Sequence, residues 1–186
     1  MSRTNGYAEI SACGLYRYKL GGNIDGRGWG DPGTTPMPIL WIMHNPSTAN
    51  ATEDDATIQT ITIFSELWRD FGRLMVGNLY AYRTKHPKVM RLAWRQGIDI
   101  VGPQNDAWLA KMAREVRDAG GKIVAAWGAG ASGPREFREA HRSRWRAVAE
   151  LLGDLHCLKI TQDGSPVHPL YQSHRLTPQI WTARHP

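Results

Sequence analysis

The sequence has little cysteine, no long apolar run and fewer acidic than basic residues. Its two cysteines, Cys13 and Cys157, stand far apart and fit no metal-ligand spacing, so we expect a reduced, cytoplasmic setting. No apolar run approaches the roughly 20 residues that cross a membrane. Residues 1–4 do not resemble the start of a signal peptide. These absences exclude a disulfide scaffold and predict no membrane partner.

The size and charge of the chain narrow the class of protein further. Its 186 residues predict one domain, 1–186, that is large enough to bury a core without crosslinks. Lys and Arg number 23 against 17 Asp and Glu, which gives a formal net charge of +6. This balance favours a polyanionic partner such as DNA or a nucleotide. Nothing in the pattern requires an obligate protein partner.

Strand-like and helix-like segments alternate along the chain. Short buried strands are predicted at 39–43, 74–79, 122–128 and 155–160. Helices are predicted at 56–70, 104–119 and 134–152. Asp54 or Asp55 is placed to cap the first helix, and the Gly-rich segment 21–33 reads as the most mobile loop. The alternation indicates an α/β fold with three layers, α/β/α, around a central, mainly parallel four-stranded sheet.

Polar residues follow each predicted strand. Because ligands bind beyond the carboxyl ends of strands in an open α/β sheet, four loops are expected to converge on one edge. The candidate residues in these loops are His44, Asn45, Pro46 and Ser47, then Asn78, Tyr80 and Tyr82, then Trp127 and Gly128, and finally His168 and Tyr171. This convergence predicts a ligand site.

Most of these features also have a purely structural interpretation. Segment 45–48 is typical of a turn, and Asp54 and Asp55 fit a helix N-cap and a first-turn acid as well as a catalytic role. His168 before proline is typical of a turn histidine. Asn78 is different, because a buried amide needs hydrogen-bond partners. None of the seven histidines has a metal-ligand spacing, so we predict no metal and no cofactor.

Basic residues gather in two places. Arg138, Arg142 and Arg146 recur every four residues and form a stripe on one helix. Arg83 and Lys85 follow the second predicted strand. A solvated surface is the ordinary interpretation, and contact with a nucleic-acid backbone is the functional one.

Several longer motifs carry a resemblance to a known family. The stretches IMHNPSTANATEDDATI, VGNLYAYRTKHP, VGPQNDAWL and DGSPVHPLY, together with Tyr16-Arg17-Tyr18, resemble the bacterial and phage family DUF1643. The resemblance covers nearly the whole chain. It identifies relatives and implies no particular reaction.

A more distant resemblance carries chemistry. Four short motifs are similar, in order, to those of the uracil-DNA glycosylase superfamily: Met43-His44-Asn45-Pro46, LMVGNL ending near Asn78, Trp127-Gly128 with Ala131, and His168-Pro169-Leu170. The resemblance implies an enzyme that flips a mismatched or modified base out of DNA and hydrolyses its N-glycosidic bond.

This second resemblance also implies roles for individual residues. Asn78 would read the base edge, and His168 would stabilise the charge of the departing base. Asn45 would position water, with Asp54 or Asp55 as base. Stacking on the base would come from His44, Tyr80 or Tyr82. Two alternatives keep the same pocket: an enzyme that installs or processes a modified base in phage-type DNA, and a non-catalytic reader of modified bases.

Overall fold

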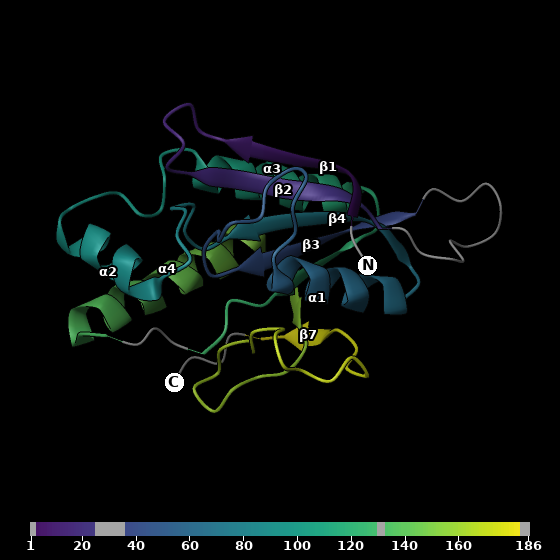
Figure 1. Ribbon diagram of the computed structural model, residues 1–186. Helices are drawn as coiled ribbons and strands as arrows, with labels where there is room; N and C mark the ends of the chain where they lie inside the picture. The colour runs from purple at the N-terminus through teal and green to yellow at the C-terminus, as the bar shows by residue number, and fades with distance from the viewer. Residues whose placement is uncertain (1–2, 25–35, 130–132, 183–186) are drawn as a thin grey trace.

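The computed structural model describes residues 3–24, 36–129 and 133–182. Within these ranges one seven-stranded sheet carries four helices (Figure 1). The strands lie side by side in the order β1 (Arg3–Ile10), β2 (Arg17–Ile24), β4 (Phe71–Asn78), β3 (Met37–Met43), β5 (Lys122–Ala125), β6 (Leu155–Cys157) and β7 (Gln179–Trp181).

The sheet is mixed and has seven strands, so the predicted sheet of four strands lacked three of them. The four predicted strands correspond to β3, β4, β5 and β6, and each is parallel to its neighbour within this group. The predicted ends of two strands are wrong, because β5 stops at Ala125 and β6 at Cys157, each three residues early. Antiparallel strands extend the sheet at both edges, because β2 pairs with β4, β1 pairs with β2, and β7 pairs with β6.

The predicted 21–33 loop is wrong in its first four residues. Residues 21–24 belong to β2, where Leu20 and Ile24 are buried against the sheet. Glycine suits this strand because a Cβ on Gly21 would meet the Tyr7 ring and the Leu74 carbonyl at less than 3 Å. Residues 25–33 lie outside the described part of the chain, so the predicted mobility there stays a prediction.

Three helices match the predicted ones, and a fourth was missed. The matches are α1 (Ala56–Leu67), α3 (Asn105–Asp118) and α4 (Arg135–Leu152). The missed helix is α2 (Pro87–Arg95), whose nine residues begin at a proline and bury only Met90 and Ala93. So short an apolar face leaves too little periodicity to predict a helix from sequence.

Alternating residues of β3 divide the core into two layers. Leu40 and Ile42 pack with α2, α3 and α4 on one face. Ile39, Trp41 and Met43 pack with α1 on the other face. In Figure 1, α1 lies in front of the sheet and α3 behind it. The central strands are buried on both faces, as predicted from their continuous apolar runs.

The register of the parallel strands aligns their polar ends. Met43 at the end of β3 stands beside Asn78 at the end of β4, and Ile42 stands beside Ala125 of β5. The segments that begin at His44, Leu79 and Ala126 therefore leave the same edge of the sheet. Within the described ranges, no helix is both long and apolar enough to cross a membrane.

Candidate functional site

A cavity of about 620 Å³ opens at this edge of the sheet. It is lined by segments that follow β3, β4 and β5, by the start of α1 and by the loop after β6. Nine of the predicted site residues line it: His44, Asn45, Ser47, Asp55, Asn78, Lys85, Trp127, Gly128 and His168. The structure thus brings together residues from four separate parts of the sequence.

Asn78 forms part of the cavity wall with an unsatisfied side chain. The residue is 1% exposed, and among the described residues neither Nδ2 nor Oδ1 of its amide has a hydrogen-bond partner. Its backbone carbonyl accepts a hydrogen bond from Asn105 Nδ2 at 3.1 Å. The nearby Trp127 also lines the cavity, and its buried indole N–H has no partner. Buried polar groups are rarely left unpaired in proteins. Because Asn78 and Trp127 both line the cavity, a ligand bound there would satisfy them.

Arg17 is a cavity residue that the sequence analysis did not include among the site residues. Its side chain donates from Nη1 to the Ala49 carbonyl at 2.6 Å, while Nε has no partner. Burial lowers the pKa of Arg17 to about 10, and the charge of Asp55 opposes this shift. The only signal in the sequence is an arginine between Tyr16 and Tyr18, and a basic residue in a strand more often faces solvent.

Asp55 serves as the N-cap of α1 and also faces the cavity. Its Oδ1 accepts a hydrogen bond from the Ile58 backbone N–H at 3.0 Å. Its charge raises the pKa of both Arg17 and His168. The predicted capping role is therefore confirmed, and the position of Asp55 in the cavity wall leaves a second role open to it.

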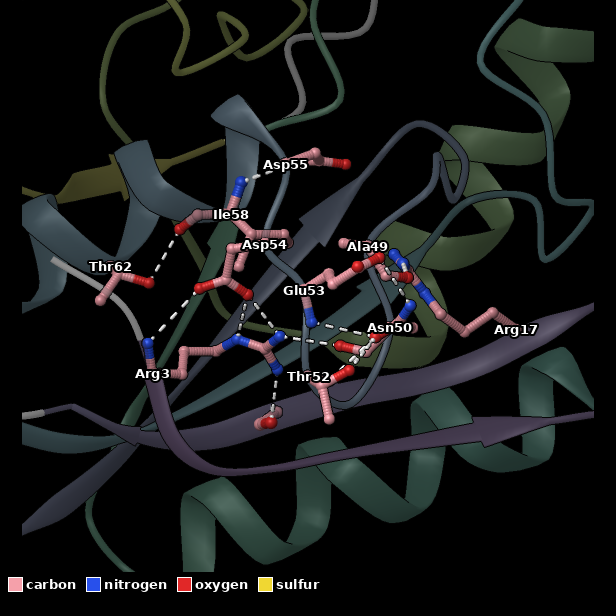
Figure 2. Close-up of polar contacts among 11 residues, drawn as sticks. Arg3, Arg17, Ala49, Asn50, Thr52, Glu53, Asp54, Asp55, Ile58 and Thr62 are labelled. Atoms are coloured by element: carbon pink, nitrogen blue, oxygen red, sulfur yellow. Dashed lines mark hydrogen bonds and ion pairs between the residues drawn. The ribbon is translucent and has the colours of Figure 1, made fainter.

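Asp54 points the other way, as Figure 2 shows. Its carboxylate forms a buried ion pair with Arg3, whose Nε donates to Oδ1 at 2.7 Å and whose Nη2 donates to the same oxygen. Arg3 also donates to the carbonyls of Gly21 and Asn50. Asp54 does not line the cavity among the described residues, and its contacts are those of a structural group.

His44 is held by its neighbour Asn45. His44 Nδ1 and Asn45 Oδ1 are 2.9 Å apart, and Asn45 Nδ2 donates to the carbonyls of Pro46 at 3.0 Å and Thr84 at 2.8 Å. Burial lowers the pKa of His44, and the charge of Arg91 lowers it further. The Asn45 amide therefore orients the histidine and ties two loops together.

His168 stands across from Gly128. Its Nδ1 accepts the backbone N–H of Leu170 at 3.2 Å. Burial lowers the pKa of His168, and so does the charge of His44. Gly128 has φ of 87°, and a Cβ at this position would lie 3.3 Å from the His168 Cβ. Glycine at 128 thus allows both the left-handed backbone and the close approach of the histidine.

Tyr80 lies behind the cavity wall in a buried aromatic cluster. Its hydroxyl is 3.2 Å from His141 Nδ1, and the His44 ring contacts both side chains. Burial lowers the pKa of His141 to about 4 and raises that of Tyr80. Tyr82 packs against Tyr16. The predicted stacking of Tyr80 or Tyr82 on a base therefore has no support from their position.

The other predicted residues lie away from the described lining. Tyr171 is 99% exposed with φ of 66°. Arg83 donates to the Gly14 carbonyl at 3.0 Å. Arg146 lies over the Trp145 ring. Of the predicted stripe, Arg138 and Arg142 are exposed while Arg146 is partly covered. Pro46 is buried beside the cavity wall.

The charged residues of the lining are mainly basic. Arg17, Lys85 and Arg91 face the cavity together with one carboxylate, that of Asp55. This balance suits an anionic ligand. In the described ranges no group of three or more His, Cys, Asp or Glu side chains is placed to hold a metal ion.

The comparisons with known proteins place the chain among relatives without naming a reaction. The model of one family, described as "Protein of unknown function (DUF1643)", matches residues 24–170. No curated protein and no solved structure gave a significant match. The resemblance to DUF1643 is thus confirmed, and the more distant one to uracil-DNA glycosylases gains no support.

Proposed function

The chain belongs to the DUF1643 family of proteins of unknown function, and we propose that its cavity binds a nucleobase and hydrolyses the N-glycosidic bond that joins the base to its sugar. The substrate in this proposal is a flipped, mismatched or modified base in DNA, or the same base in a nucleotide. The unpaired amide of Asn78 is the observation that carries it.

The amide of Asn78 matches the hydrogen-bonding edge of a base. A primary amide offers a donor and an acceptor side by side, and both are unused in Asn78. The Watson–Crick edge of a pyrimidine or purine presents the complementary pair once the base has left the stack. The indole N–H of Trp127 supplies a further free donor. A bound base would satisfy groups that are costly to leave unpaired.

The charges around the cavity favour a ligand that carries phosphate. Among the described residues of the lining, three are basic, Arg17, Lys85 and Arg91, and one is acidic, Asp55. Phosphate contacts supply much of the affinity of proteins for nucleic acids, and they weaken as salt is added. A nucleotide or a DNA strand therefore fits better than a free base.

In this proposal His168 supports the departure of the base. Cleavage leaves negative charge on the base, and a well-aimed donor in such a site stabilises charge by about 3–4 kcal/mol. Its Nδ1 is occupied by the Leu170 N–H, so the other ring nitrogen is available to the cavity. Asp55 lies close enough for its charge to favour a proton on this ring.

The test is a base-release assay on oligonucleotides that carry mismatched, deaminated or alkylated bases, at roughly 50 mM salt where phosphate contacts are strong. Mass spectrometry under single-turnover conditions detects the free base and the abasic strand. We expect release by the wild type and none by Asn78→Leu, with Asn105→Leu as the matched control of a buried amide outside the lining.

Three other results would each overturn the hydrolysis. Binding without release would make the protein a reader of bases. A strand whose base gained or lost mass without release would make it a base-modifying enzyme. No binding of DNA or nucleotide at low salt would remove nucleic acid from the proposal altogether.

A further inference from the structure

The two histidines that line the cavity are held by different hydrogen bonds. His44 follows β3, and His168 lies in the loop after β6. The two rings are near enough for the charge of one to shift the pKa of the other. In a neutral imidazole one nitrogen carries a proton and the other accepts one, and the hydrogen bonds of the ring decide which is which.

The proton of His44 is fixed on Nδ1 by the Asn45 amide. Asn45 Nδ2 uses both of its hydrogens, one for the Pro46 carbonyl at 3.0 Å and one for the Thr84 carbonyl at 2.8 Å. Rotating this amide would place its oxygen against two carbonyl oxygens, so the assignment is unambiguous. The atom 2.9 Å from His44 Nδ1 is therefore the amide oxygen, which can only accept. The lone pair of His44 is left on Nε2.

The proton of His168 is fixed on Nε2 by the backbone. The N–H of Leu170 donates to His168 Nδ1 at 3.2 Å. A backbone N–H can only donate, so Nδ1 carries the lone pair. The neutral ring then bears its hydrogen on Nε2. The two histidines thus have opposite tautomers.

We propose that the opposite tautomers divide the proton chemistry of the cavity, with His44 Nε2 as the proton acceptor and the Nε2–H of His168 as the donor. This division rests on the proposed function for its place in catalysis. Both residues line the cavity, and the hydrogen bonds that the two rings make to other described residues involve only their Nδ1 atoms.

The hydrolysis consumes one water and uses one nitrogen of each histidine. A water oxygen forms a bond to the sugar carbon C1′, and the C1′–N bond breaks with its electron pair going to the base. One proton of the water passes to His44 Nε2. The departing base accepts a hydrogen bond from His168 Nε2–H. His44 ends as the imidazolium and returns its proton to solvent.

Burial lowers the pKa of both histidines and keeps the rings neutral near pH 7, although the Asn45 hydrogen bond opposes this shift at His44 and the charge of Asp55 opposes it at His168. Burial lowers the pKa of His44, and the side chains that face it are Arg91, His141, Tyr80 and Asn45. Burial also lowers the pKa of His168, whose charged neighbours are His44 and Asp55. A neutral ring is required for His44 to accept a proton.

The contacts of Asn45 differ from the role expected from the sequence, in which Asn45 would position water. With both hydrogens and the oxygen of its amide in use, Asn45 is a positioning residue for His44 and has no group left to hold water. Asn45→Ala removes the acceptor, and we expect His44 to become a mixture of both tautomers. The test therefore reads the tautomer directly.

The experiment is long-range ¹H–¹⁵N correlation NMR of the full chain labelled with ¹⁵N-histidine, at a pH well above the pKa of both rings. Loss of one signal set in His44→Gln and another in His168→Gln assigns the two residues. We expect the Nδ1–H form for His44 and the Nε2–H form for His168. The same form in both rings, or the two forms exchanged, overturns the proposal whatever the activity.

The rate measurements then test the roles. In single-turnover base release, His44→Gln should lower the rate about 100- to 10,000-fold and remove the fall in rate at acidic pH. His168→Gln, which retains an N–H donor, should keep more of the rate than His168→Leu. A full rate in His44→Gln overturns its role as acceptor. Failure of the wild type to release any base overturns the proposed function alone, because the NMR result still decides which histidine accepts and which donates.

Discussion

Arg3 and Asp54 join β1 to the loop before α1 through an ion pair with side chains that are 2% and 7% exposed. Figure 2 shows the guanidinium lying between the carboxylate and the carbonyls of the neighbouring segments. The next residue, Asp55, points to the cavity instead. The two adjacent carboxylates therefore have different roles: Asp54 forms a structural ion pair, and Asp55 lines the cavity.

The contribution of the ion pair to stability can be measured by substituting Asp54. Asp54→Ala leaves the charge of Arg3 buried without its partner, so we expect the free energy of unfolding to fall by about 3 kcal/mol. Urea unfolding measures the change. A double-mutant cycle with Arg3→Ala isolates the pair, because the double variant removes both charges. A loss below about 1 kcal/mol would contradict a buried pair and match an exposed one.

Asp55 is tested by two substitutions that separate its cap from its charge. Asp55→Ala should cost about 1 kcal/mol of stability because the N-cap is lost, whereas Asn caps helices as well as Asp. Both variants remove the one carboxylate from the lining, so both should bind DNA or a nucleotide more tightly than the wild type. Urea unfolding and fluorescence anisotropy give the two readouts. Equal stability of the two variants would contradict the capping role.

Asn78 and Asn105 form a matched pair of buried amides. Asn105 Nδ2 donates to the carbonyls of Asn78 and Leu79 while its Oδ1 has no partner, whereas neither amide atom of Asn78 has a partner among the described residues. Asn105→Leu should lower the free energy of unfolding by about 2 kcal/mol, because the buried Asn78 carbonyl loses the Asn105 donor, while the Leu79 carbonyl keeps only the donor from Arg144. Asn78→Leu should leave it unchanged or raise it by about 1 kcal/mol, because an unpaired polar group is removed. A loss in Asn78→Leu as large as in Asn105→Leu would contradict a residue kept for a ligand.

Gly128 is compared with Gly97, which has a similar backbone. Their φ values are 87° and 76°, but only a Cβ on Gly128 meets a neighbour, the Cβ of His168. Both Ala variants should lose about 1 kcal/mol of stability from the left-handed conformation. Only Gly128→Ala should also shift the NMR signals of His168. Unchanged signals would mean that the ring does not depend on this contact.

Because His141 is buried, we expect the free energy of unfolding to fall in acid. Its folded pKa of about 4 lies below the ordinary value of 6.5, so the unfolded chain binds the extra proton first as pH falls. The stabilisation is complete above pH 6.5 and is lost between there and about pH 4, by roughly 3 kcal/mol in total. His141→Gln should reduce this slope in a series of urea unfolding curves. An unchanged slope would assign the acid sensitivity to other groups.

The sequence determined the features that depend on local pattern. Apolar runs located β3 to β6, apolar periodicity located α1, α3 and α4, and Asp55 was placed correctly as a possible cap. The residues collected from the segments that follow the predicted strands include nine that line the cavity. These features follow from neighbours in the chain, because side-chain direction in a strand or helix repeats with a fixed period.

The tertiary structure decided what depends on distant partners. The pairing of β2 with β4 and of β7 with β6 turned a parallel core into a mixed sheet. The ion pair with Arg3 gives Asp54 a structural role, and the fold places the buried Arg17 in the cavity wall. Asn45 and the Leu170 backbone set the tautomers of two histidines. Sequence alone does not fix such hydrogen bonds and charges, because their strength depends on burial and on atoms that the chain brings together only when folded.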